Sequence, residues 1–132
     1  MKKIFLYLLL SVSIQTFSQS LQLSVYSEVS ILTVGPGDEL FSAFGHTAIR
    51  IKDPLLKFDY VYNYGMFDFN QPNFYLNFTK GKLLYKLGAY PFKNFVSQNR
   101  YQKRWIKEQV LNLTQIQRQK LFEFLNNNLK PQ

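Results

Sequence analysis

The sequence HTAIRIKDPLLKFDYVYNYG, residues 46–65, decides the fold. Its first part alternates with a period of two, which predicts a β-strand. One side of that strand carries His46, Ala48 and Arg50, and the other carries Thr47, Ile49 and Ile51. Asp53-Pro54 interrupts the alternation, and FDYVYNYG at 58–65 predicts a second strand that stops at Gly65. We expect the two strands to pair as a hairpin with a loop of about five residues.

The segments on either side of this hairpin predict further strands and helices. EVSILTV at 28–34 is β-branched and apolar and predicts a strand. A short helical turn at 39–44 should follow, with Asp38 as its cap and Gly45 at its end. Downstream we expect helices at 74–81 and 92–104, strands at 83–90 and 105–113, and a final helix that Thr114 and Gln117 open as a capping box. The predicted fold class is α+β, a mainly antiparallel sheet with packed helices.

The first 18 residues have the pattern of a secretory signal peptide. Two lysines precede an apolar run at 4–14, and Thr16 and Ser18 are small residues suited to a cut after Ser18. The alternative is a retained membrane anchor, which needs roughly 18–20 apolar residues. We therefore expect a signal peptide at 1–18, a single domain at 19–132, and a location in the periplasm or cell envelope.

Basic side chains dominate the middle of the domain. The chain has 16 Lys and Arg against 8 Asp and Glu, and no acidic residue occurs from Phe69 to Lys107. The partner that we expect is an anionic phospholipid surface, which attracts basic residues with about 1 kcal/mol each. An exported protein rarely meets nucleic acid, so we expect no nucleic-acid partner. The alternative is a solvated basic face without a partner.

Few residue types are available for catalysis or metal binding. The chain has one histidine, His46, and no cysteine, and its acidic residues show no ligand-like spacing. A zinc site needs three or four such ligands, so we expect no metal and no cofactor. Ser42 lies near His46 in the sequence, but no nucleophile elbow surrounds it.

His46 is the candidate catalytic residue. It opens a strand directly after Gly45, and the nearby Ala48 is small and leaves room beside it. Asn63 or Tyr62 of the neighbouring strand could bind one ring nitrogen and fix the tautomer. A histidine oriented in this way is suited to accept a proton. The alternative is a structural histidine that satisfies the core or caps a helix.

Three sequence strings resemble those of a known family. They are TVGPGDELFSAFGHTAIRIKDP, YVYNYGMFDFNQPNFYLNFTKGKLLYKLGAYPF and EQVLNLT. They resemble the Lnb-type N-terminal periplasmic domain family of bacterial envelope proteins, from about Glu28 to the C-terminus. That family is similar to circularly permuted papain-like thiol folds, including permuted cell-wall peptidases and the lecithin–retinol acyltransferase group. In those folds the histidine strand precedes the helix that carries the nucleophilic cysteine.

The resemblance implies a function in lipoprotein N-acylation. An acyl chain would pass from a phospholipid to an enzyme cysteine as a thioester, and then to the amino terminus of a lipoprotein. His46 matches the family histidine, the expected general base, and Asn63 is a candidate orienter. Because no cysteine is present, we expect 19–132 to be the N-terminal portion of such a domain and inactive alone. The alternatives are a thiol amidase acting on cell-wall peptides and a non-catalytic envelope binding module.

Overall fold

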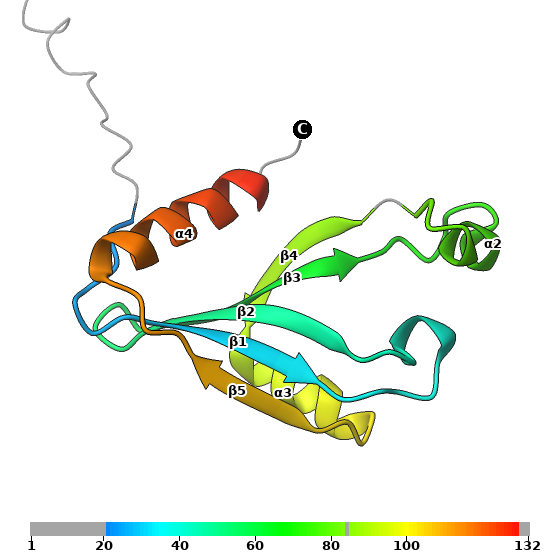
Figure 1. Cartoon of the computed structure of the whole chain (residues 1–132), viewed down its shortest axis with the longest axis horizontal. Helices are drawn as coiled ribbons and strands as arrows, with labels where there is room; N and C mark the ends of the chain where they lie inside the picture. The colour runs from blue at the N-terminus through cyan, green and yellow to red at the C-terminus, as the bar shows by residue number, and fades with distance from the viewer. Residues whose placement is uncertain (1–20, 84, 130–132) are drawn as a thin grey trace, which may run out of the picture.

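The computed structural model describes residues 21–83 and 85–129 (Figure 1). The predicted signal peptide, 1–18, lies outside the described residues. In chain order the elements are β1 (Glu28–Val34), the 3-10 turn η1 (Leu40–Ser42), β2 (His46–Asp53), β3 (Phe58–Met66), α2 (Phe74–Thr79), β4 (Lys86–Pro91), α3 (Phe92–Tyr101), β5 (Ile106–Val110) and α4 (Gln115–Leu129).

The strands form one antiparallel sheet in the order β4-β3-β2-β1-β5. The predicted hairpin is formed by β2 and β3, and its loop spans the four residues 54–57, so that Asp53 pairs with Phe58. On the other side of β2, His46 pairs with Val34, the last residue of β1. The α+β class and the mainly antiparallel sheet are confirmed.

Each face of the sheet is covered by one helix, because the strands alternate apolar side chains between the two faces. The first core joins Val29, Ile51 and Tyr62 to Phe122 and Leu125 of α4. The second core joins Leu32, Val34, Ala48 and Val61 to Phe95 of α3. Figure 1 shows α4 and α3 on opposite sides of the sheet. His46 shares its face with Ala48, and therefore lies on the α3 side.

Several predicted boundaries were wrong. The helical turn is the short η1, and its N-terminus has no side-chain cap, so Asp38 is not a cap. Gly45 does end this turn, with a φ of 78° that favours glycine. Gly65 does not stop β3, which continues to Met66. The predicted helix 92–104 ends at Tyr101, because Lys103 turns the chain with a φ of 54°.

Two predicted strands are shorter than expected. β4 begins at Lys86 rather than at 83, and β5 occupies only 106–110 of the expected 105–113. The capping box at the start of α4 is confirmed. The backbone N–H of Thr114 donates to Gln117 Oε1 at 2.8 Å, and the N–H of Gln117 donates to Thr114 Oγ1 at 3.3 Å.

A buried carboxylate joins the start of the described chain to the hairpin. Asp53 is fully buried, and its oxygens accept hydrogen bonds from the backbone and hydroxyl of Ser24 at 2.6 and 2.8 Å. The N–H groups of Leu55 and Leu56 donate to it at 3.1 and 3.3 Å. Burial by itself would raise the pKa of Asp53, but these hydrogen bonds lower it overall.

Candidate functional site

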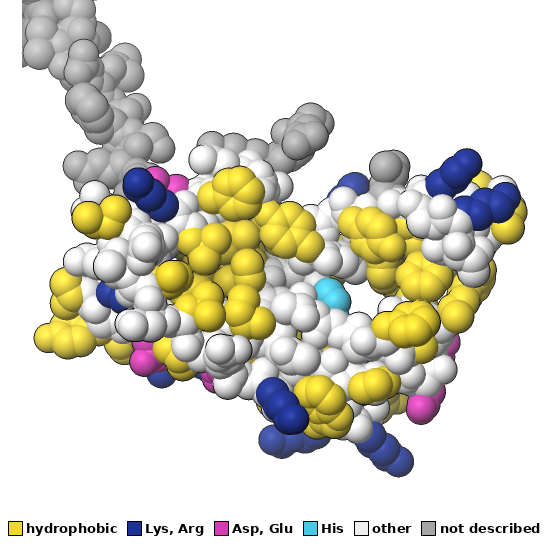
Figure 2. All heavy atoms as spheres, in the orientation of Figure 1, with side chains coloured by type: hydrophobic (Ala, Val, Ile, Leu, Met, Phe, Trp, Pro, Cys, Tyr) yellow, Lys and Arg dark blue, Asp and Glu magenta, His cyan; other side chains and the backbone are white. Residues whose placement is uncertain are grey.

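A cavity opens on the α3 face, at the end of the sheet where β2 begins. Its volume is about 420 Å³. Figure 2 shows the histidine, in cyan, at the edge of an opening between the body of the molecule and the end that carries α2. The lining residues are Val34, Phe41, Ser42, Gly45, His46, Asn63, Gly65, Met66, Phe67, Phe69, Tyr90, Asn94, Phe95, Gln98, Asn99, Gln102 and Arg104.

Both predicted site residues lie together on the wall of this cavity. His46 Nε2 makes a short hydrogen bond with Asn63 Oδ1. In this placement the amide oxygen of Asn63 faces the ring and its amide nitrogen faces away. An amide oxygen only accepts, so neutral His46 carries its proton on Nε2 and keeps the lone pair on Nδ1. The contact that sequence reasoning predicted between these two side chains is therefore present.

Tyr90 extends this pair into a chain of three side chains. Asn63 Nδ2 donates to the Tyr90 hydroxyl at 3.0 Å, which fixes the orientation of the amide. Burial raises the pKa of the Tyr90 phenol, and the hydrogen bond from Asn63 opposes that rise. The sequence did not single out Tyr90, because its pairing with Val61 depends on the register of β4.

Tyr62, the alternative orienter, lies on the opposite face. Its hydroxyl donates to Asn126 Oδ1 of α4 at 2.9 Å, and it does not line the cavity. Burial, with a smaller effect from Tyr60, raises the pKa of Tyr62 to about 12. Tyr62 therefore belongs to the core beneath α4, and the alternative was wrong.

Gly65 gives the imidazole the space that it occupies. A Cβ atom at this position would lie 3.0 Å from His46 Cε1 and 3.3 Å from Asn63 Oδ1. Such distances are tighter than ordinary van der Waals contact. A glycine within a strand often marks a close approach of another group, but the sequence pattern predicted Gly65 only as the end of the strand.

The remaining walls of the cavity differ in chemistry. The α3 side presents the amide side chains of Asn94, Gln98 and Asn99, while Phe41, Phe67 and Phe69 form an aromatic wall on the side of η1 and α2. None of the described lining residues is acidic. Ser42 also lines the cavity, but its hydroxyl donates to the Glu39 carbonyl at 3.0 Å within the η1 turn.

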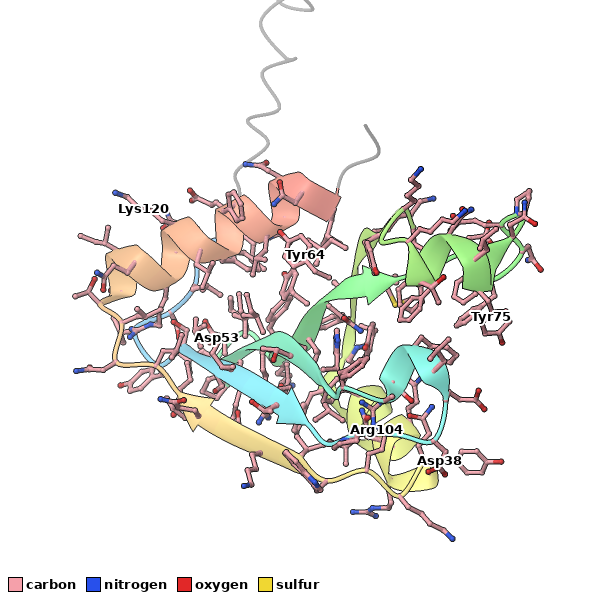
Figure 3. The ribbon with its side chains drawn as sticks, turned by 45° about the vertical axis from the view of Figure 1, so that its right-hand side comes forward. Asp38, Asp53, Tyr64, Tyr75, Arg104 and Lys120 are labelled. Carbon is pink, nitrogen blue, oxygen red and sulfur yellow. The ribbon has the colours of Figure 1, made fainter. Side chains whose placement is uncertain are left out.

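Arg104 is the cation of the cavity wall. Its Nε donates to the Gly35 carbonyl at 2.7 Å, and Nη1 donates to Gln102 Oε1 at 3.3 Å. Nη2 is buried without a hydrogen-bond partner among the described residues. Burial lowers the pKa of the guanidinium. Figure 3 places Arg104 between the segment after β1 and helix α3.

This arrangement can accept a proton and orient a polar substrate. Nδ1 of His46, which keeps its lone pair, is the basic atom, and Asn63 binds the ring through the other nitrogen, Nε2. Within 21–83 and 85–129, no group of three His, Cys, Asp or Glu side chains could hold a metal ion. The chain contains no cysteine, so the cavity presents a candidate base without a thiol.

The comparisons with known proteins identify the class. The sequence model of the Lnb N-terminal periplasmic domain matches residues 14–132, nearly the whole chain. The chain belongs to this family, and it is an exported, periplasmic domain of the cell envelope. No curated protein and no solved structure matches the chain significantly. Among the helices of the described ranges, none is long and apolar enough to cross a membrane.

Proposed function

We propose that this periplasmic domain supplies the base-bearing half of a cysteine-dependent acyl-transfer site, within a circularly permuted papain-like fold. The observation that carries the proposal is the hydrogen bond between His46 and Asn63 on the wall of the cavity. A general base needs a fixed ring, a free lone pair and space for the reacting group. Asn63 supplies the first two, and the cavity that His46 lines supplies the third.

The nucleophile in this proposal is a thiol from outside residues 1–132. His46 Nδ1 accepts its proton, and the thiolate sulfur attacks the carbonyl carbon of an acyl ester. A C–S bond forms, the ester C–O bond breaks, and the alcohol leaves with the proton from His46. In the second half, an amine attacks the thioester, a C–N bond forms and the C–S bond breaks. The amine proton returns through His46 to the sulfur.

The proposed substrates follow from the family resemblance and from the two walls of the cavity. The acyl donor is a phospholipid and the acceptor is the amino terminus of a lipoprotein. The phenylalanines Phe41, Phe67 and Phe69 offer an apolar wall for an acyl chain. We also propose that residues 1–18 are removed as a signal peptide, which delivers the domain to the periplasm.

A second candidate is a thiol amidase that acts on cell-wall peptides. It is favoured by the amide side chains of Asn94 and Gln98 along α3, which could bind a peptide backbone. The same base and thiol would then attack a peptide carbonyl, and the leaving group would be an amine. The third candidate is a non-catalytic envelope binding module, in which His46 has only a structural role.

The first test is the coding DNA after codon 132. A continuation that encodes a cysteine supports the proposal. A stop codon directly after codon 132, together with a stable folded product, would contradict it and favour the binding module.

The second test uses the protein that contains the cysteine. After incubation with phospholipid, mass spectrometry should detect a fatty-acyl adduct on that cysteine. Adduct formation should slow by about 10²- to 10⁴-fold in His46→Gln. The matched control is Thr47→Gln, the next residue of β2, which is exposed. A peptide adduct in place of the fatty-acyl adduct would support the amidase, and equal rates in both variants would rule out His46 as the base.

A further inference from the structure

Helix α2 lies at one end of the molecule (Figure 1), and large apolar side chains in and around it are exposed. Its large side chains are more than half exposed, at 56% for Phe69, 59% for Tyr75, 51% for Leu76 and 52% for Tyr85. Together with Lys80 and Lys82, which are also exposed, we call these residues the α2 surface. Large contiguous apolar patches on a protein surface mark sites of interaction.

The α2 surface rests on a cluster of packed aromatic rings. Phe74 is buried, and its ring lies 4.9 Å from that of Phe69 and 5.3 Å from that of Tyr75, measured between centroids. Phe67 lies 5.2 Å from Tyr85 in the same way. Because the inner rings pack against one another, the outer rings are held at the surface instead of folding inward.

Positive charge borders these exposed rings. The segment 66–86 contains three lysines, Lys80, Lys82 and Lys86, and one acidic residue, Asp68. A carboxylate oxygen of Asp68 accepts a hydrogen bond from the Asn70 backbone at 2.9 Å, within its own turn. Figure 2 shows dark blue side chains beside yellow ones at the end of the molecule that carries α2.

From these observations we propose that the α2 surface docks on the headgroup region of an anionic phospholipid bilayer. Tyrosine and phenylalanine favour the boundary between headgroups and acyl chains, and lysines bind the anionic headgroups. The α2 surface offers both, on one short helix and its flanking turns. This inference goes beyond the proposed chemistry and does not require it.

Charge complementarity favours a bilayer over a second copy of the chain. A symmetric dimer would place the same surface on both sides of its interface. The lysines of one copy would then face the lysines of the other, which is unfavourable. An anionic bilayer instead places opposite charge next to every lysine.

Docking through the α2 surface would also bring the cavity near the bilayer. Phe69 belongs to the α2 surface and lines the cavity, and Phe67 links the cavity wall to Tyr85. Figure 3 places Tyr75 at the α2 end, far from Lys120 on α4. A molecule docked through α2 therefore holds the rim of its cavity close to the lipid headgroups.

The test measures binding to vesicles by co-sedimentation, with protein purified from the periplasm of the expressing cells. Vesicles of phosphatidylglycerol and phosphatidylcholine should bind the protein, and vesicles of phosphatidylcholine alone should bind it much more weakly. Lys80→Gln with Lys82→Gln should weaken binding about 30-fold, which corresponds to about 1 kcal/mol per lysine. Tyr75→Ser with Leu76→Ser should also weaken it.

Matched control variants remove the same kinds of side chain, two lysines or two exposed apolar residues, from positions outside the α2 surface. Lys93→Gln with Lys120→Gln removes two exposed charges, and Tyr101→Ser with Ile116→Ser removes side chains that are 90% and 69% exposed. Both control pairs should bind like the wild type. Since all variants share one amino terminus, any difference between them comes from the substituted surface, and circular dichroism checks that each is folded.

Two results would overturn the proposal. The first is equal binding by the α2 variants and the control variants, which would place the contact elsewhere. The second is a dimer in solution that the α2 substitutions dissociate while vesicle binding stays unchanged, because a second copy of the chain would then be the occupant of this surface.

Discussion

Replacing Asn63 by alanine should both destabilise the fold and release the His46 ring. Asn63 makes one hydrogen bond to His46 and one to Tyr90, and each contributes about 1 kcal/mol net. The Tyr90 hydroxyl, left without its donor, adds up to about 1 kcal/mol. The free energy of unfolding should therefore fall by about 2–3 kcal/mol. Tyr90→Phe removes only one of these bonds and should cost about 1 kcal/mol.

The two substitutions should be coupled, because both remove the bond between Asn63 and Tyr90. The double variant should be more stable than the sum of the single effects predicts, by about 1 kcal/mol. Urea denaturation followed by the fluorescence of Trp105, the one tryptophan, measures all three values. Since the chain has one histidine, ¹⁵N NMR reports the His46 tautomer directly, and Asn63→Ala should replace the single Nε2–H form by a mixture of the two tautomers.

A neighbouring residue gives the control for this prediction. Tyr62→Phe removes the hydrogen bond to Asn126 on the other face, so it should lower stability without changing the imidazole signals. The reasoning would be refuted if Asn63→Ala changed the unfolding free energy by less than about 0.5 kcal/mol and left the imidazole ¹⁵N signals unchanged. It would also be refuted if Tyr62→Phe moved the imidazole signals as much as Asn63→Ala.

Three further predictions concern the surrounding structure. Folding lowers the pKa of Asp53, so the carboxylate stabilises the fold above the unfolded-state pKa of 3.8. This contribution is lost as the pH falls through the lowered pKa. Asp53→Asn should therefore lose less thermal stability than the wild type between neutral pH and pH ~3. Gly65→Ala should displace the His46 ring by a few tenths of an ångström and cost about 1 kcal/mol, measured by NMR shifts and urea denaturation. Arg50 binds Asp59 at 2.7 and 2.8 Å and Glu108 at 3.0 Å, and Arg50→Gln should cost about 2 kcal/mol in urea denaturation, since its partners are partly exposed.

Local pattern predicted the strands and the last helix well, because each of those signals is contained in a few neighbouring residues. The alternation after His46 identifies β2, and the β-branched run at 28–34 identifies β1 at its observed bounds. Thr114 and Gln117 locate the start of α4 in the same way. Boundaries such as the start of β4 depend on which neighbour supplies hydrogen bonds, and the sequence does not contain that information.

The choice between Asn63 and Tyr62 shows why the site was harder to predict. Adjacent residues of a strand point to opposite faces, so a shift of one residue in the register exchanges them. The expected loop of five residues would leave that register open. The observed four-residue loop pairs Arg50 with Val61, which places Asn63 on the His46 face and Tyr62 beneath α4. One residue of loop length therefore decides which side chain meets the histidine.

The candidate site and the core beneath α4 lie on opposite faces of the sheet. On one face, Tyr62 and Asn126 join β3 to α4 in a core that does not reach the cavity. On the other face, the core around Phe95 borders the cavity, and His46, Asn63 and Tyr90 lie on the cavity wall. The partner of His46 is an amide, which fixes the ring position without adding negative charge. With Arg104 on the same wall and no acidic side chain among the described lining residues, the cavity favours an anionic or electron-rich reacting group, which is what a thiolate or a lipid headgroup would bring to it.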